Sequence, residues 1–183
     1  KLVRILSEGS AAAKALSAGA LRNLAFGSAA SEAAIAQAGG FGPLVALLSA
    51  ADTETQESAA GALLNASFSD ASKAAIVDLG ALTPLTALLT SQSESVQETA
   101  AAAFQSLALL PCNRHRIAGA GALPPLVALL GSPSCKAQAA AAGTLRNLTL
   151  DPPVSRLPEA SSPMKQRAAS IGAMPEGACQ DGV

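Results

Sequence analysis

The chain of 183 residues carries a net charge of −1, and half of its residues are hydrophobic although only 2% are aromatic. The near-zero net charge leaves no basic surface for nucleic-acid phosphates. The excess of Ala and Leu over strand-forming residues favours an all-α protein. The three cysteines, Cys112, Cys135 and Cys179, match no zinc or CxxC spacing. We therefore expect an intracellular protein of the cytoplasm or the nucleus that does not bind nucleic acid.

In chain order, the spacing of apolar residues predicts eleven helices and no strand. The predicted helices span residues 2–7, 11–26, 31–38, 41–49, 54–67, 72–79, 82–90, 94–109, 114–119, 123–130 and 135–149. Two runs without charge, Ala33–Ala51 and Ile117–Cys135, are long enough to raise the question of a membrane span. Glycine and proline interrupt both runs, so each is predicted to form two short helices and no membrane span.

A repeat with a period of about 41 residues organises these helices. The block Leu44–Leu48 recurs one period later at Leu85–Leu89 and two periods later at Leu126–Leu130, and it also aligns with Leu2–Leu6 near the start of the chain. Each of the three later blocks follows a proline, namely Pro43, Pro84 and Pro125. The predicted repeats cover residues 1–26 (a partial repeat), 27–68, 69–109 and 110–150, which together form an array over residues 1–150.

Each full repeat is predicted to contain three helices. The first helix ends at Gly39, Gly80 or Gly121, where glycine can adopt the left-handed conformation that closes a helix. The second helix begins with a proline in its first turn, where no backbone donor is needed. The third helix is the longest, and its small and apolar residues recur at helical spacing.

The period and the three helices resemble the armadillo repeat. The resemblance is carried by the stretches Asn113–Leu130, Ala142–Leu148 and Ala18–Leu24, and it covers about residues 1–150. The Ala-, Gly- and Leu-rich consensus looks like that of plant and algal arrays. The resemblance implies a right-handed α-solenoid of about four three-helix repeats, whose third helices line a concave groove.

One column of equivalent positions in the third helices is a candidate binding site; it consists of Asn23, Asn65, Ser106 and Asn147. In armadillo proteins that resemble importin-α and β-catenin, an Asn here projects into the groove. A carboxamide can pair with both the N–H and the C=O of an extended peptide. The alternative is that these side chains bind a neighbouring repeat or water. Arg22 and Arg146, the only cations beside the column, are included in the predicted peptide-binding site.

The sequence departs from the importin-α pattern at the position four residues before each Asn. Importin-like repeats carry Trp there, whereas this chain has Gly19, Gly61, Ala102 and Gly143. Without Trp walls for cation–π contacts, we do not expect recognition of a basic nuclear-localisation peptide.

The sequence contains no enzyme motif. Cys112 and His115, the only His, are three residues apart, but both fall at the polar start of a first helix, and no third group is evident to orient them. We therefore expect neither catalysis nor a cofactor, metal or small-molecule substrate.

The function implied by the resemblance is that of an adaptor or scaffold that holds an extended segment of a partner protein. Two alternatives remain open, which are the substrate-recognition array of a larger ubiquitin ligase and a cofactor of the 70-kDa heat-shock chaperones. Residues 151–163 are predicted to be a linker rich in Pro and Ser. Residues 164–183 are predicted to be a vestigial fifth repeat followed by a disordered tail, because residues 166–175 echo residues 115–124.

Overall fold

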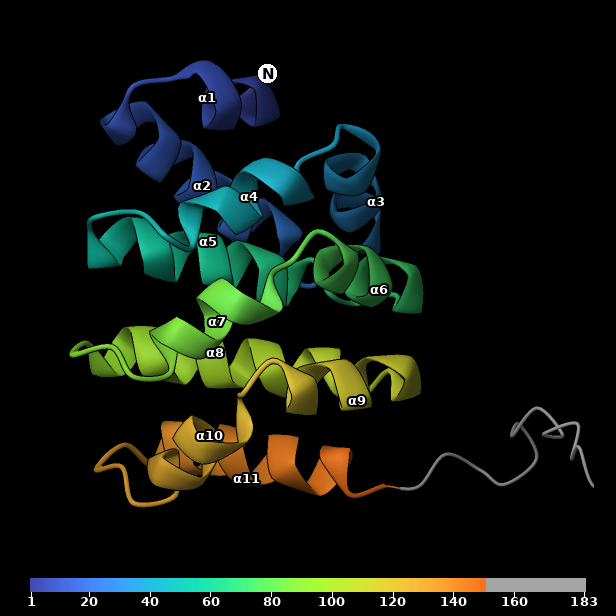
Figure 1. Ribbon diagram of the computed structural model, residues 1–183. Helices are drawn as coiled ribbons and strands as arrows, with labels where there is room; N and C mark the ends of the chain where they lie inside the picture. Colours follow the sequence, from blue (N-terminus) through green and yellow to red (C-terminus); the bar gives the residue numbers. More distant parts are fainter. Residues whose placement is uncertain (151–183) are drawn as a thin grey trace, which may run out of the picture. The chain divides into compact units, whose positions relative to one another are not determined.

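The computed structural model describes residues 1–150, and these residues form eleven α-helices without a strand (Figure 1). The helices are α1 (Leu2–Glu8), α2 (Ala11–Ala25), α3 (Ala29–Gln37), α4 (Phe41–Leu47), α5 (Thr53–Asn65), α6 (Asp70–Asp78), α7 (Leu82–Leu88), α8 (Glu94–Leu107), α9 (Pro111–Gly119), α10 (Leu123–Leu129) and α11 (Cys135–Leu148). Every predicted helix is present, and no end differs from the prediction by more than three residues. The linker and fifth repeat predicted beyond residue 150 lie outside the described residues.

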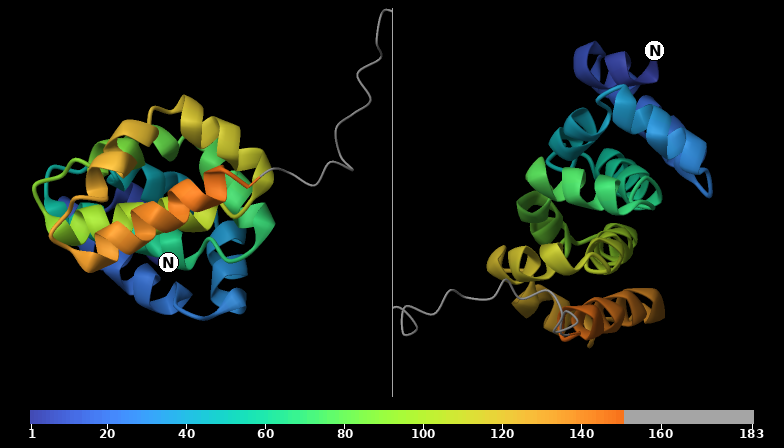
Figure 2. Two further views of the ribbon diagram at one scale, coloured as in Figure 1. Left: turned by 90° about the horizontal axis from the view of Figure 1, so that it is seen from below. Right: turned by 90° about the vertical axis from the view of Figure 1, so that its right-hand side faces the viewer.

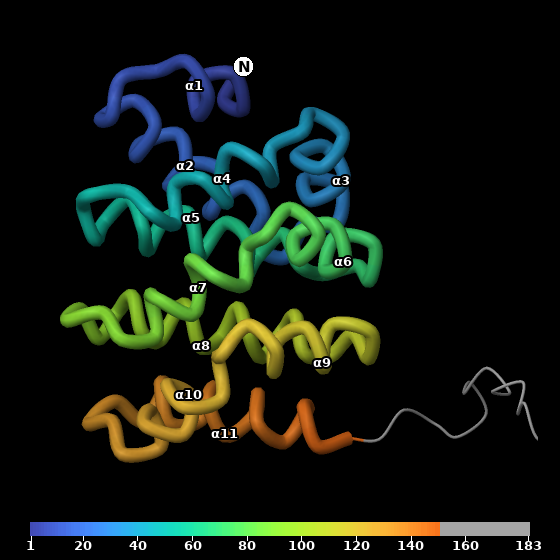
Figure 3. Tube along the Cα trace, viewed as in Figure 1, coloured from blue at the N-terminus to red at the C-terminus, as the bar shows by residue number. Residues whose placement is uncertain are grey.

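The helices follow one another as repeats of three. The long third helices α2, α5, α8 and α11 each pack on the next, and the first helix α9 packs on α6 in the same way. The tube in Figure 3 shows the chain taking the same path in each successive layer, and the end-on and side views in Figure 2 agree. The all-helical α-solenoid predicted from the repeat is therefore confirmed.

Glycine and proline set the turns between these helices, as the sequence predicted. Gly39, Gly80 and Gly121 have φ of 70°, 84° and 75°, a left-handed conformation that is costly for other residues. The prolines of the second helices lie within the first turn of α4, α7 and α10. The first and second helices of each full repeat are thus separated by a turn at a fixed glycine.

The core is built from leucines of the second helices and alanines of the third helices. Leu44, Leu85 and Leu126 occupy equivalent positions in α4, α7 and α10 and are fully buried. Alanine lets helix backbones approach one another, and Ala59, Ala100 and Ala141 are buried where the third helices pack together. This packing brings equivalent residues of neighbouring third helices within reach of each other.

The two long uncharged runs break at these glycine turns into the pairs α3–α4 and α9–α10. Within residues 1–150, every helix is too short or too polar to cross a lipid bilayer.

Candidate functional site

The four residues of the predicted column, which we call the Asn column, lie at equivalent places near the C-terminal ends of the third helices. Asn23 lies in α2, Asn65 is the last residue of α5, Ser106 lies in α8, and Asn147 lies in α11. The last carbonyl groups of a helix have no partner within the helix. The Asn column is therefore placed beside backbone acceptors of the neighbouring repeat.

Three members of the column donate a hydrogen bond to the preceding repeat. Asn65 Nδ2 lies 2.8 Å from the carbonyl oxygen of Arg22, and Asn147 Nδ2 lies 3.2 Å from that of Gln105. Ser106 Oγ lies 3.2 Å from the carbonyl oxygen of Ser67 and 2.7 Å from the Ser67 hydroxyl. These bonds satisfy carbonyls near the ends of α2 and α8 and just beyond the end of α5, and they join consecutive repeats.

The accessibility of the column changes along the array. Asn23 is exposed, Asn65 and Ser106 are half-buried, and Asn147 is only 1% exposed. Asn65 uses its amide nitrogen in the bond to Arg22, and its Oδ1 accepts no hydrogen bond from residues 1–150. A carboxamide in this state retains an acceptor and one N–H for a ligand. Binding of a peptide by the column stays a prediction.

Arg22 lies against the next repeat. Its Nη1 donates to Glu57 Oε1 at 2.9 Å, and a Cβ placed on Gly61 would meet Arg22 Cδ at 2.7 Å. The Ser95 hydroxyl has the largest effect on the pKa of Glu57; burial raises this pKa, but Ser95 and Arg22 together lower it below its ordinary value. Arg22 is thus an ion-paired bridge between repeats, whereas Arg146 is exposed on α11.

The same arrangement recurs at the other end of the array. A Cβ on Gly143 would lie 2.8 Å from Gln105 Cδ, so the Gln105 side chain occupies the space above that glycine. Gly61 and Gly143 are two of the positions that carry Trp in importin-like repeats. Here the glycines receive a side chain of the preceding repeat, which explains physically why no large residue stands at either position.

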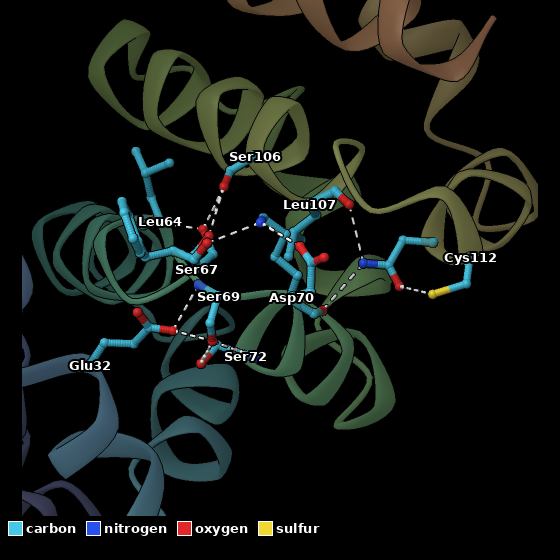
Figure 4. Close-up of polar contacts among 12 residues, drawn as sticks. Glu32, Leu64, Ser67, Ser69, Asp70, Ser72, Ser106, Leu107 and Cys112 are labelled. Atoms are coloured by element: carbon cyan, nitrogen blue, oxygen red, sulfur yellow. Dashed lines mark hydrogen bonds and ion pairs between the residues drawn. The ribbon is translucent and has the colours of Figure 1, made fainter. Parts of the chain in front are cut away.

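A second polar network, which was not predicted from the sequence, fixes the loops that follow the third helices (Figure 4). Glu32, only 3% exposed, accepts hydrogen bonds from the Ser69 hydroxyl at 2.6 Å and the Ser69 N–H at 2.9 Å. Burial alone would raise the pKa of Glu32, but the bonds from Ser69 and Ser72 and the charge of Lys73 lower it overall. Glu32 therefore anchors the start of α6 from the preceding repeat.

The next two repeats use other side chains for the same purpose. Lys73 Nζ donates to the carbonyl oxygen of Phe68 at 3.0 Å, and Arg114 Nε donates to that of Ala108 at 3.2 Å. Glu32, Lys73 and Arg114 follow one another at the repeat period, so they form one column. The period could have revealed this column, but its members differ in charge and length, and their roles depend on contacts that a sequence does not show.

Asn113 completes this network. It is fully buried, and its Nδ2 lies 3.1 Å from the carbonyl oxygen of Leu107 and 3.3 Å from that of Lys73. The side chain therefore ties α9 to the end of α8 and to α6. Cys112, its neighbour, is exposed, and its Sγ contacts Asn113 Oδ1 at 4.0 Å. Across the described part of the chain, no three His, Cys, Asp or Glu side chains are grouped closely enough to hold a metal.

Comparison with known proteins identifies the repeat. Residues 30–68, 69–109 and 113–150 each match the family model of the Armadillo/beta-catenin-like repeat. A comparison with curated protein sequences gives no match.

Solved structures similar to this chain include engineered and designed proteins. The crystal structure of an engineered protein is 38% identical with a TM-score of 0.76, and the match covers 80% of this chain and 60% of that chain. A designed armadillo repeat protein is 30% identical with a TM-score of 0.75, covering 80% of this chain and 62% of that chain. A designed armadillo repeat protein in complex with the peptide (KR)4 is 30% identical with a TM-score of 0.74, covering 80% and 62%.

The chain thus spans about 60% of the length of these relatives. The three matched stretches cover more than half of the chain, and their limits fall close to the three-helix units seen in the structure. The chain therefore belongs to the armadillo/β-catenin-like repeat family.

Proposed function

We propose that this protein is a scaffold that binds an extended segment of a partner protein along the face formed by its third helices. The observation that carries the proposal is the Asn column, which repeats in register over four stacked helices. At Asn65 the column combines partial exposure with an unused carboxamide oxygen. The designed armadillo repeat protein in complex with the peptide (KR)4 shows that a relative of this chain binds a peptide.

Geometry supports an extended ligand. Neighbouring packed helices lie about 8–10 Å apart, and an extended chain advances about 3.3 Å per residue. Along the accessible part of the column, at Asn23, Asn65 and Ser106, one polar side chain per repeat can therefore meet the peptide backbone at every second or third residue. Backbone pairing of this kind supplies affinity, while side-chain contacts beside it supply specificity. We also propose that the protein is located in the cytoplasm or the nucleus.

The bonds between repeats prepare the column for this role. Because Asn65 is held by Arg22 O and Ser106 by Ser67 O, both side chains are oriented before a ligand arrives. Pre-orientation reduces the conformational entropy that binding removes. Asn65 is therefore the column member at which a substitution should affect binding most, whereas Asn147 is buried and should act through the packing of α11 on α8.

A selection experiment tests the proposal. A library of random dodecapeptides displayed on phage is selected against the full chain, and the affinities of synthetic peptides from the selection are measured by calorimetry. Asn65→Ala should weaken binding at least about fivefold, corresponding to the loss of one hydrogen bond. Gln92→Ala, an exposed substitution in the loop between α7 and α8, is the matched control. If Asn65→Ala and Gln92→Ala bind the peptides equally well, the Asn column is not the binding site.

A further inference from the structure

Each repeat displays one large apolar side chain just after its third helix. These residues are Phe26, Phe68, Leu109 and Leu150, each three positions after a member of the Asn column. Their exposed fractions are 78%, 75%, 54% and 51%. A single exposed apolar residue is ordinary on a protein surface, but its recurrence at one position in four repeats is not. We call these four residues the apolar stripe.

Backbone hydrogen bonds place the stripe beside the Asn column. The N–H of Phe26 donates to the carbonyl oxygen of Asn23 at 3.4 Å, and that of Leu150 donates to Asn147 at 3.3 Å. Leu109 makes the same bond to Ser106 at 3.2 Å. Three of the four stripe residues are therefore joined to their column residue by a tight turn, and Phe68 lies three residues after Asn65 without this bond. The two rows follow the same succession of third helices, one polar and one apolar.

The loop that carries Phe68 is held on both sides of that residue (Figure 4). Ser67 Oγ donates to the carbonyl oxygen of Leu64 at 2.7 Å, and Ser69 N–H donates to Glu32 at 2.9 Å. Lys73 Nζ holds the carbonyl oxygen of Phe68 itself. An exposed aromatic side chain on a fixed loop loses little backbone entropy when a partner binds.

The loop that carries Leu109 is fixed in an equivalent way. Asn113 donates to the carbonyl oxygen of Leu107, and Arg114 Nε donates to that of Ala108. Arg114 Nη1 also donates to the carbonyl oxygen of Leu150, the next member of the stripe. In these loops, polar side chains form hydrogen bonds to backbone carbonyl groups, and the apolar side chains of the stripe remain exposed.

A hollow beside Phe68 offers further room for a ligand. It has a volume of about 510 Å³ and lies between α3 and α6. Most of its lining residues are small or apolar, and they include Ala29, Ala33, Ala36, Ala71 and Phe68. This volume falls in the range of sites that accept side chains or small ligands. A partner side chain that enters it would contact the Phe68 ring.

We propose that the partner segment carries apolar side chains at a regular interval of two or three residues, one for each repeat, and that these pack on the apolar stripe. This inference rests on the protein-binding role proposed for the Asn column, and it adds the chemistry of the ligand. The interval follows from the spacing of helices and of extended chains. The stripe contains no charged side chain, so the expected ligand differs from the Lys- and Arg-rich peptide bound by the designed relative.

The peptides selected from the dodecapeptide library test this inference. We expect them to share apolar residues at a fixed interval of two or three positions. The double variant Phe68→Ser/Leu109→Ser should bind a synthetic consensus peptide at least about tenfold more weakly, because two apolar contacts are lost. Both residues are exposed, so the variant should keep its melting temperature and its helical circular dichroism. Gln92→Ser is the control, since it introduces the same residue elsewhere on the surface.

The outcomes separate the two proposals. Peptides that depend on Asn65 but bind the double stripe variant normally would overturn the role of the stripe and leave the scaffold function standing. Selected sequences dominated by Lys and Arg without apolar periodicity would have the same consequence. If no selected peptide depends on Asn65, the scaffold function fails at this site, and the inference about the stripe fails with it.

Discussion

Arg22 lies over Gly61, so closely that a Cβ at position 61 would come within 2.7 Å of both Arg22 Cδ and Nε. The two residues belong to different repeats, and the contact directs the guanidinium to Glu57. Glycine at position 61 therefore makes room for an ion pair between repeats. The helix itself would favour Ala over Gly by about 1 kcal/mol.

The substitution Gly61→Ala should separate the helix preference for Ala from the ion pair between Arg22 and Glu57. The new methyl group should displace the flexible end of Arg22, so stability should stay level or rise by up to about 1 kcal/mol. A double-mutant cycle of Arg22→Ala and Glu57→Ala should give a coupling of about 0.5–1 kcal/mol in the parent chain and almost none in the Gly61→Ala background. Chemical denaturation monitored by circular dichroism measures both. An unchanged coupling would show that Arg22 does not need the space above Gly61.

Asn147→Ala should destabilise the array by about 1–2 kcal/mol, because it leaves the Gln105 carbonyl without its hydrogen bond. Asn23→Ala is the matched control, since Asn23 occupies the equivalent position but is exposed, and its loss should change stability by less than about 0.5 kcal/mol. Thermal and urea unfolding of the two variants make the comparison. Equal effects would mean that the bond between α11 and α8 contributes nothing.

Asn113→Ala should be more damaging, with a loss of about 2–3 kcal/mol, because two carbonyl groups, those of Leu107 and Lys73, would each lose a buried donor. Cys112→Ser changes the adjacent exposed residue and should be nearly neutral. Hydrogen exchange should locate the Asn113→Ala effect in α9 and the end of α8. Protection that falls uniformly over the array would contradict this local role.

Glu32→Gln should make stability less dependent on pH. The folded state lowers the pKa of Glu32 below its ordinary value of 4.5, so the carboxylate stabilises the fold above that pH. This contribution is lost as the pH falls from 4.5 through the lowered folded-state pKa. The variant should be about 1 kcal/mol less stable at pH 7, because a neutral acceptor replaces a charged one, and the difference should narrow in acid.

The substitution Ser69→Ala tests whether the hydrogen bond from Ser69 causes the dependence of stability on Glu32. Ser69 supplies two of the hydrogen bonds to Glu32, one of which the substitution removes. In the Ser69→Ala background, Glu32→Gln should therefore cost less than in the parent chain. Unfolding curves recorded from mildly acidic to neutral pH give the four stabilities. A cost of Glu32→Gln that is the same in both backgrounds would assign the effect to other neighbours.

The helices and their repetition were determined by the sequence itself. Local signals specify the helices. These signals are the glycines Gly39, Gly80 and Gly121, a proline in the first turn of the helix that follows each of them, and apolar residues at helical spacing. Such signals act within a few residues along the chain. The repeat period also showed which positions are equivalent, and it therefore identified the Asn column as a set.

Only the tertiary structure decided what those equivalent residues contact. Asn65 meets the carbonyl of Arg22, which is 43 residues away, and Asn147 meets that of Gln105, which is 42 residues away. The same stacking places Arg22 over Gly61, buries Asn147 and leaves Phe68 exposed. The repeat period shows which residues of different repeats are equivalent. Which residues touch depends on how closely, and in what register, one third helix packs on the next. The side chains of both helices together set that packing.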